Sequence, residues 1–223
     1  MVNGPRGVAF EHVAFDLDGT LADTRADLVA AVNHVLEDVG RAPIAPDVLY
    51  RYVGDGARAL VERALGPAGA GLVTAAIARF MDYYGAHLLD ATRLYPGLEE
   101  ALAELAGRGV ALSVLTNKPE AMSRTILEGL GVARHFVAVL GGDSLPTRKP
   151  DPAGLELLRQ RTGTPRERTL LVGDSRVDVE TARAARVSFC GVAWGIVPDQ
   201  LREANPERVV ASAAELLGVV ERG

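Results

Sequence analysis

Short apolar runs alternate along the chain with longer stretches in which apolar side chains recur at helical spacing. The short runs are apolar nearly throughout, which predicts parallel strands covered on both faces. The longer stretches predict amphipathic helices, and together they indicate an α/β fold with an open sheet. The expected strands are Val8–Phe15, Ala111–Leu115, Phe136–Leu140, Thr169–Val172 and Ser188–Val192. The expected helices are Glu99–Gly107, Glu120–Leu130, Pro152–Thr162, Val177–Ala185 and Ala213–Val220.

One region breaks this alternation, because residues 24–94 contain no convincing strand. Apolar side chains there repeat at helical spacing up to Gly40, which ends the first run, and the expected helical patterns beyond it are Pro46–Val53, Ala57–Leu65 and Leu72–Leu89. A simple crossover between strands needs far fewer residues. We therefore predict a core of residues 1–22 and 95–223 and a helical cap of residues 23–94, with hinges near 21–24 and 95–97. The alternative is that these helices pack against an edge of the sheet.

Composition narrows the class of protein. The chain has 223 residues, 48% of them hydrophobic and 24% charged, which indicates a folded globular protein. Its net charge of −5 argues against non-specific nucleic-acid binding. The single cysteine, Cys190, lies in an apolar run where we expect it to be buried, and it fits a reducing, cytoplasmic setting. No apolar stretch approaches the ~18 residues of a membrane span, and the polar opening Met1–Gly7 predicts a loose tail without a signal peptide. The oligomeric state is not readable from the sequence.

The most informative segment is Phe15-Asp16-Leu17-Asp18-Gly19-Thr20-Leu21, which follows an apolar run. Gly19 indicates that the strand ends there, so that Asp16 and Asp18 lie at an exposed strand tip. Two carboxylates about 4 Å apart repel by roughly 4 kcal/mol at an effective dielectric constant near 20. A divalent cation would relieve this repulsion, and oxygen ligands suit Mg²⁺. A calcium loop is the alternative, but Asp27 stands at the twelfth position, where such a loop has Glu.

Three further segments place polar residues where a predicted strand or loop ends: Ser113–Lys118, Arg148–Pro152 and Val172–Asp178. Each has an ordinary explanation when taken alone, such as a helix cap at Thr116 or a solvated loop lysine at Lys149. In an open α/β sheet, however, ligands bind beyond the carboxyl ends of the strands. We therefore expect the four segments to meet in one site.

In this combination and order, the four segments resemble those of the haloacid dehalogenase superfamily of phosphotransferases, over residues 15–195. Within it the chain is most similar to phosphoglycolate phosphatases, on the segments Leu94–Gly97, Leu115–Pro119, Gly141–Asp143 and Gly173–Arg176. The resemblance implies a Rossmann-like sheet with a mobile cap, and the insertion after the first motif matches the helical cap type. One departure is Arg186, where many relatives have a glycine that suits a left-handed helix end.

The resemblance also implies a role for each motif residue in a Mg²⁺-dependent phosphomonoester hydrolase. Asp16 would attack phosphorus to form an aspartyl-phosphate, and Asp18 would serve as general acid and base. Lys149 would offset negative charge on Asp16 and on the transferring group. The remaining roles would be phosphoryl binding by Thr116 and the N–H of Asn117, Mg²⁺ binding by Asp16, the Asp18 carbonyl and Asp174, and support from Asp178 and Ser175 behind these ligands.

The substrate is not specified by these motifs, because the leaving group would contact the cap. A small phosphate ester with a carboxylate, such as 2-phosphoglycolate, needs a cation or backbone N–H donors. The best candidates lie in or near residues 51–58, where glycines let the backbone approach a ligand closely and arginines could pair with a carboxylate; they are Arg51, Gly54, Gly56, Arg58 and Arg63. The alternative is a turn with solvated arginines.

Several rival functions share the core. A β-phosphoglucomutase-like phosphotransferase is disfavoured because such relatives typically carry Val at the position of Thr20, and a dehalogenase because it lacks an acid at the position of Asp18. A phosphonatase needs a cap lysine, whereas the only lysines are Lys118 and Lys149. A non-catalytic relative that binds phosphorylated ligands is disfavoured because the motif set is complete. Pyrophosphate, sugar phosphates and nucleoside monophosphates remain open as substrates.

Overall fold

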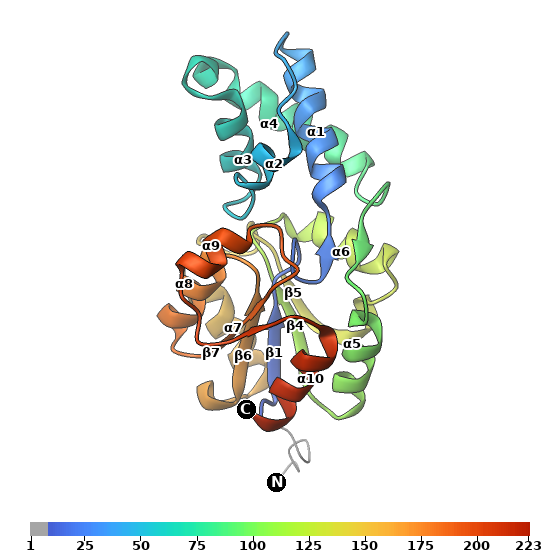
Figure 1. Ribbon diagram of the computed structural model, residues 1–223, viewed down its shortest axis with the longest axis vertical. Coiled ribbons are helices and arrows are strands. Elements are labelled where there is room, and N and C mark those ends of the chain that lie inside the picture. Colours follow the sequence, from blue (N-terminus) through green and yellow to red (C-terminus); the bar gives the residue numbers. More distant parts are fainter. Residues whose placement is uncertain (1–8) are drawn as a thin grey trace.

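The computed structural model describes residues 9–223, and its centre is one sheet of six parallel strands (Figure 1). The strand order is β5-β4-β1-β6-β7-β8, which confirms the predicted α/β fold with a Rossmann-like parallel sheet. The strands are β1 (His12–Phe15), β4 (Ala111–Leu115), β5 (Phe136–Leu140), β6 (Thr169–Gly173), β7 (Ser188–Val192) and β8 (Val209–Val210). The expected tail Met1–Gly7 and the first residue of the expected first strand, Val8, lie outside the described residues.

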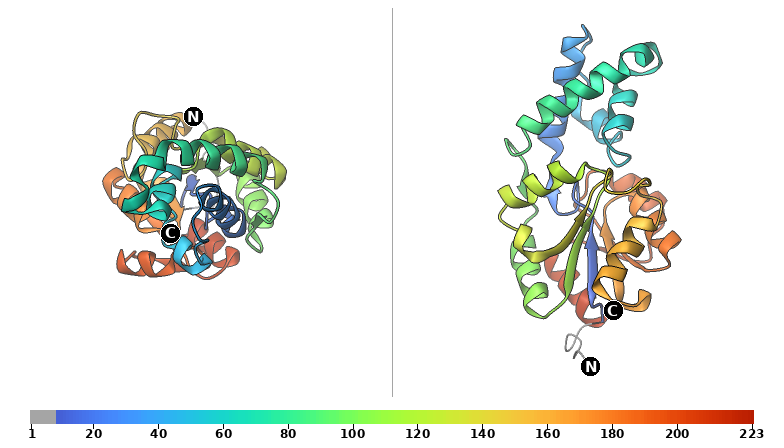
Figure 2. Two further views of the ribbon diagram at one scale, coloured as in Figure 1. Left: turned by 90° about the horizontal axis from the view of Figure 1, so that it is seen from above. Right: turned by 180° about the vertical axis from the view of Figure 1, so that it is seen from behind.

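Helices cover both faces of the sheet because its strands are apolar on both sides (Figure 2). On one face Val13 and Phe15 belong to the same buried cluster as the apolar residues of α5 (Leu98–Gly107), α6 (Glu120–Gly129) and α10 (Ala213–Arg222). On the other face Ala14 packs with residues of α7 (Ala153–Thr162) and α8 (Arg176–Ala185). Cys190 is buried in the first cluster, as predicted, and burial raises the pKa of its thiol to about 12.

Some element boundaries differ from the predictions. Strand β1 begins at His12, so residues 9–11 of the predicted strand are not part of it. The N–H groups of Ala9 and Phe10 donate to the Val220 carbonyl near the end of α10 and not to a neighbouring strand. The predictions also missed β8 and α9 (Pro198–Glu203), which are too short for a periodic pattern. Single-turn 3₁₀ helices, Ala133–His135 and Arg166–Arg168, lead into β5 and β6.

The segment after β1 forms a group of helices beyond the carboxyl ends of the strands (Figures 1 and 2). It consists of α1 (Arg25–Asp38), α2 (Pro46–Tyr50), α3 (Ala57–Leu65), the 3₁₀ helix Pro67–Leu72 and α4 (Val73–Ala86). Helices α2 and α4 end three residues before the predicted Val53 and Leu89. After α2 the chain turns at Gly54, whose φ of +120° does not fit a helix. We call this group the cap, and the division into a cap of residues 23–94 and a core remains a proposal.

A short antiparallel ribbon joins the cap to the sheet. It pairs β2 (Ala22–Asp23) with β3 (Arg93–Leu94), strands that sequence reasoning missed because each has only two residues. Behind the ribbon, the buried carboxylate of Asp27 accepts hydrogen bonds from the N–H groups of Ala91 and Thr92 and from the Thr92 hydroxyl. The first turn of α1 is thereby tied to the returning chain.

Candidate active site

Three of the four predicted motifs meet because their strands are neighbours in the sheet. Strand β1 lies between β4 and β6, and Phe15 is in register with Val114 and Val172. Asp16, Thr116 and Asp174, which follow these strands, therefore reach the same edge. Parallel strands place all their carboxyl ends on one side, so this proximity follows from the topology.

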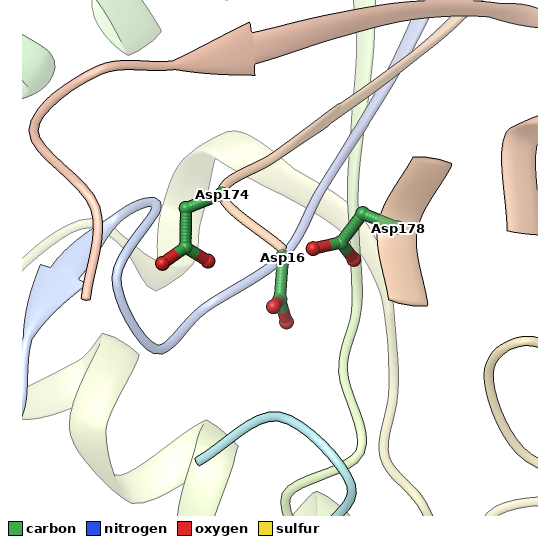
Figure 3. A group of neighbouring side chains, drawn as sticks. All are labelled: Asp16, Asp174 and Asp178. Atoms are coloured by element: carbon green, nitrogen blue, oxygen red, sulfur yellow. The ribbon is translucent and has the colours of Figure 1, made fainter. Parts of the chain in front are cut away.

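Three carboxylates gather at this edge (Figure 3). Oxygen atoms of Asp16, Asp174 and Asp178 lie within 4.8 Å of one another, and all three residues are buried. Burial raises the pKa of Asp16 to about 6, an increase that Lys149 opposes and Asp178 reinforces. Burial also raises the pKa of Asp174 well above its ordinary value, and Asp178 adds to this shift. The cluster therefore holds more negative charge than its surroundings compensate.

Lys149 is the cation of this cluster. Its buried ammonium lies 2.9 Å from Asp16 Oδ1 and 2.6 Å from Asp178 Oδ1. Burial alone would lower the pKa of Lys149, but the two carboxylates raise it above its ordinary value, so the side chain stays charged. Asp178 Oδ2 accepts from the N–H and hydroxyl of Ser175, which caps α8. Both oxygens of Asp178 thus have protein partners, and one of these partners is Lys149.

The donor set fits one divalent cation. Three carboxylates face one ammonium, which leaves two negative charges without a partner among these groups. Carboxylate oxygens are hard ligands of the kind that Mg²⁺ prefers. The backbone at Gly19 and Gly195 packs closely against Asp174. A Cβ atom would lie 2.2 Å from Asp174 Oδ2 at Gly19 and 2.5 Å from it at Gly195. Gly19 also has a φ of +80°, so the turn after Asp18 requires glycine on two counts.

Asp18 has a separate set of partners. Its Oδ1 accepts from the Thr24 hydroxyl at 2.7 Å and lies 2.9 Å from the ammonium of Lys118. Its Oδ2 has no hydrogen-bond partner within residues 9–223. Sequence reasoning assigned no function to Lys118. The signal was present, since Lys118 is one of only two lysines and directly follows the Thr116-Asn117 pair.

Thr116 and Asn117 present groups that suit an anion. Thr116 is buried, and the N–H of Asn117 has no acceptor among the described residues. The Asn117 side-chain amide donates to the carbonyls of Gly54 and Lys149, both at 3.0 Å. Since Gly54 belongs to the cap, this residue also links the cap to the core.

A cavity of about 50 Å³ separates the motif residues from the cap. Its core side includes Asp16, Asp18, Thr116, Asn117, Lys118, Asp174 and Ser175, and its cap side includes Leu28, Val53, Leu60, Phe80 and Tyr84. The volume admits only a few water molecules. The site is therefore polar at its base and mainly apolar at its roof.

The cap residues predicted to contact substrate divide into two groups. Gly54 and Gly56 line the cavity, whereas Arg51, Arg58 and Arg63 do not. Arg58 pairs with Glu62 at 3.1 Å, and Arg63 donates to the Tyr52 carbonyl at 2.9 Å. At Gly54 and Gly56, both of which have positive φ, it is backbone and not an arginine side chain that lines the cavity.

The chain resembles known proteins over most of its length. A family model for haloacid dehalogenase-like hydrolases matches residues 13–192. A phosphoglycolate phosphatase of Pseudomonas putida is 41% identical over 82% of this chain and 69% of its own, and one of Neisseria gonorrhoeae is 39% identical over 93% of both chains. Among solved structures, a predicted phosphoglycolate phosphatase from Haemophilus somnus superposes with a TM-score of 0.90 at 31% identity, covering 95% of this chain and 98% of its own.

Proposed function

We propose a specific reaction for this protein. It belongs to the haloacid dehalogenase-like hydrolase family and is a phosphatase. The proposed reaction is hydrolysis of 2-phosphoglycolate, or of a similar small phosphorylated metabolite, through an aspartyl-phosphate. The observation that carries the proposal is the pairing of Asp16 Oδ1 with Lys149 at 2.9 Å beneath a cavity that Asp18 also lines. This arrangement provides a nucleophile, an electrostatic partner and a proton carrier at one point.

In the first step Asp16 attacks phosphorus, forming the Asp16–phosphorus bond while the bond from phosphorus to the ester oxygen breaks. Its Oδ1 is held by Lys149 and by the Leu17 N–H, so Oδ2 is the oxygen left to react. Lys149 keeps its charge and offsets the negative charge that the attacking carboxylate and the phosphoryl group bring together.

Asp18 moves the proton. Its Oδ1 is held by Thr24 and Lys118, and its free Oδ2 donates a proton to the departing ester oxygen. The same carboxylate then accepts a proton from the water that attacks the phosphorylated Asp16, which releases phosphate and restores the nucleophile.

The remaining groups position the phosphoryl oxygens. The Thr116 hydroxyl and the Asn117 N–H are donors without protein acceptors in the described chain, and they would hold these oxygens. Mg²⁺ would be held by the carboxylates of Asp16 and Asp174 and the carbonyl of Asp18; when bound, it supplies positive charge to the transferring group.

One observation supports a small leaving group: relatives of about 40% identity are named phosphoglycolate phosphatases. Under this proposal, hydrolysis is inefficient without Mg²⁺, and large phosphate esters are poor substrates.

The test is Mg²⁺-dependent hydrolysis of p-nitrophenyl phosphate, followed by a panel of phosphate esters ranked by kcat/KM. Asp16→Asn is expected to lower kcat on the order of 10⁴-fold, because the nucleophile is lost. Asp47→Asn, at an exposed acid of the cap, is the matched control and is expected to keep full activity. Substantial turnover by Asp16→Asn would refute the nucleophile assignment, and a panel led by large esters would refute the substrate.

A further inference from the structure

The roof of the active-site cavity offers little to a charged leaving group. Among the described residues that line the cavity, the only basic side chain is Lys118. The cap contributes mainly apolar side chains, among them Leu28, Leu60 and Phe80. A carboxylate placed against them without a cation would lose its hydration and gain no partner. Among the side chains of this lining, Lys118 is therefore the cation that an anionic leaving group can reach.

One N–H donor of Lys118 has no acceptor among the described residues. An ammonium group carries three N–H donors. Lys118 directs one at Asp18 Oδ1, 2.9 Å away, and one at the Tyr84 hydroxyl oxygen, 2.8 Å away. Within residues 9–223 it has no third acceptor, although the side chain is buried beside the cavity.

Tyr84 supplies a second unused donor. Because its oxygen accepts from Lys118, its own proton is free for another acceptor, and the described residues provide none. Burial raises the pKa of Tyr84 to about 12, so the hydroxyl keeps this proton at neutral pH. The ring is fully buried in α4 and stacks on Phe80 with centroids 5.4 Å apart, which sets the position of the hydroxyl.

We propose that these two donors, one from Lys118 in the core and one from Tyr84 in the cap, bind the carboxylate of the substrate and select phosphate esters of 2-hydroxycarboxylates. Two adjacent donors match the two oxygens of a carboxylate, and one of them is charged. The inference rests on the proposed function, since it specifies the leaving group of the same hydrolysis.

The position of Asp18 adds a requirement on length. Asp18 donates a proton to the ester oxygen, and its other oxygen lies 2.9 Å from Lys118. In a 2-hydroxycarboxylate ester a single carbon separates the ester oxygen from the carboxylate, so the neighbouring Asp18 and Lys118 can contact both groups at once. A longer spacer moves the carboxylate past Tyr84 into the apolar roof or moves the ester oxygen away from Asp18.

The experiment compares Tyr84→Phe with the wild type on three esters. They are 2-phosphoglycolate, 2-hydroxyethyl phosphate, which has an uncharged leaving group and is called the neutral ester below, and the phosphate ester of 3-hydroxypropionate, which is one methylene longer than 2-phosphoglycolate. The wild type is expected to prefer 2-phosphoglycolate to both of the others by kcat/KM. Tyr84→Phe is expected to lower kcat/KM for 2-phosphoglycolate about tenfold, mainly through KM, because one bond to a charged group is lost. For the neutral ester we expect a change of less than about threefold.

Tyr83→Phe is the matched control, because Tyr83 is on the same helix but does not line the cavity. The melting temperature of each variant shows whether the fold is retained. A second readout is the Kd of each ester for Asp16→Asn with and without Tyr84→Phe, which measures binding without turnover. There, a loss confined to 2-phosphoglycolate supports the proposal.

Two outcomes for Tyr84→Phe overturn the inference and leave the proposed function intact. One is an equal loss of kcat/KM on 2-phosphoglycolate and on the neutral ester, which means that Tyr84 only positions Asp18 through Lys118. The other is no loss of kcat/KM on either ester. A wild type that hydrolyses 2-phosphoglycolate no better than the neutral ester overturns the inference and the proposed substrate together, but not the phosphatase activity. Absence of turnover on every ester refutes the proposed reaction itself.

Discussion

At the scale of single residues, burial decides how titratable groups outside the active site behave. His12 is fully buried in β1, where its Nε2 lies 2.8 Å from the Ser113 hydroxyl and its Nδ1 has no partner. Burial lowers the pKa of His12 to about 4, and Arg159 adds to this effect. The native protein therefore keeps this side chain neutral over a pH range in which the unfolded chain protonates it.

This difference predicts how stability depends on pH. Between about pH 6.5 and 4 the unfolded chain binds a proton that the native chain does not, so the free energy of unfolding falls as the pH falls, by roughly 3 kcal/mol for this residue. Urea unfolding of the wild type and of His12→Gln at pH 7 and pH 4.5 measures the difference. We expect His12→Gln to show the shallower dependence, and parallel profiles would contradict the pKa of His12.

Arg186 is a second residue whose local setting has a measurable consequence. It ends α8 in the left-handed conformation, with φ 56° and ψ 45°, as the comparison with glycine-bearing relatives suggested. Residues with a side chain adopt this conformation at a cost of about 1 kcal/mol or more, whereas glycine adopts it freely.

Arg186→Gly is therefore expected to raise the free energy of unfolding by about 0.5 kcal/mol, since part of the gain is offset by the flexibility of glycine in the unfolded chain. Urea unfolding checks this value. Ala184→Gly, at an exposed position within the same helix, is expected instead to lower the free energy of unfolding by about 1 kcal/mol. Destabilisation by both variants would show that the left-handed end is not strained.

At the scale of elements, the joint between cap and core is made of very short pieces. The two-residue strands β2 and β3 pair across it, and Asp27 in the first turn of α1 binds the backbone of residues 91–92. The pairing is too small to be stable alone. We therefore expect the hydrogen bonds of Asp27 to contribute much of what holds the two chain segments of this joint in place.

Replacing Asp27 by Ala removes all of these bonds and leaves two backbone N–H groups without their acceptor. We expect a loss of about 2–3 kcal/mol in the free energy of unfolding, seen as a lower melting temperature, together with a higher KM because the cap is less well held. Glu37→Ala, at an exposed site on the same helix, serves as the control. If the two variants melted at the same temperature, Asp27 would have no special role in the joint.

At the scale of the whole molecule, the active site is assembled by two parts that face each other. The core supplies the carboxylates, Lys149 and the proposed phosphate-binding residues Thr116 and Asn117, and cap residues line the other side of the cavity. Polar bonds cross between them from Asn117 to the Gly54 carbonyl and from Lys118 to Tyr84. No helix within residues 9–223 is long and apolar enough to cross a membrane.

The excess of buried carboxylates predicts that Mg²⁺ binding depends on pH. With the pKa of Asp16 near 6 and that of Asp174 raised, protons occupy the cluster at low pH and must leave before the cation binds. We therefore expect Mg²⁺ to raise the melting temperature at pH 8 much more than at pH 5. Asp174→Asn should lose this response and Asp47→Asn should keep it. An equal rise at both pH values would contradict a site built on these carboxylates.

Much of the fold was predictable because apolar runs and helical spacing reflect burial directly. The strands Ala111–Leu115, Phe136–Leu140 and Ser188–Val192 have the predicted bounds. The two-residue strands β2, β3 and β8 were not predictable, since so short a segment has no period of its own and pairs only where the tertiary structure brings a partner. The same holds for the start of β1, where the first N–H groups bind α10.

The sequence by itself determined the α/β class, the helical insertion and the chemical types at the strand ends, because these depend on local pattern and on residue identity. Only the tertiary structure decided which side chains meet. It placed Lys149 between Asp16 and Asp178, left the cap arginines out of the cavity lining, and brought Tyr84 of the cap to Lys118 of the core, which also contacts Asp18. Contacts of this kind join residues far apart in the chain, and their geometry depends on how cap and core pack, which no local pattern encodes.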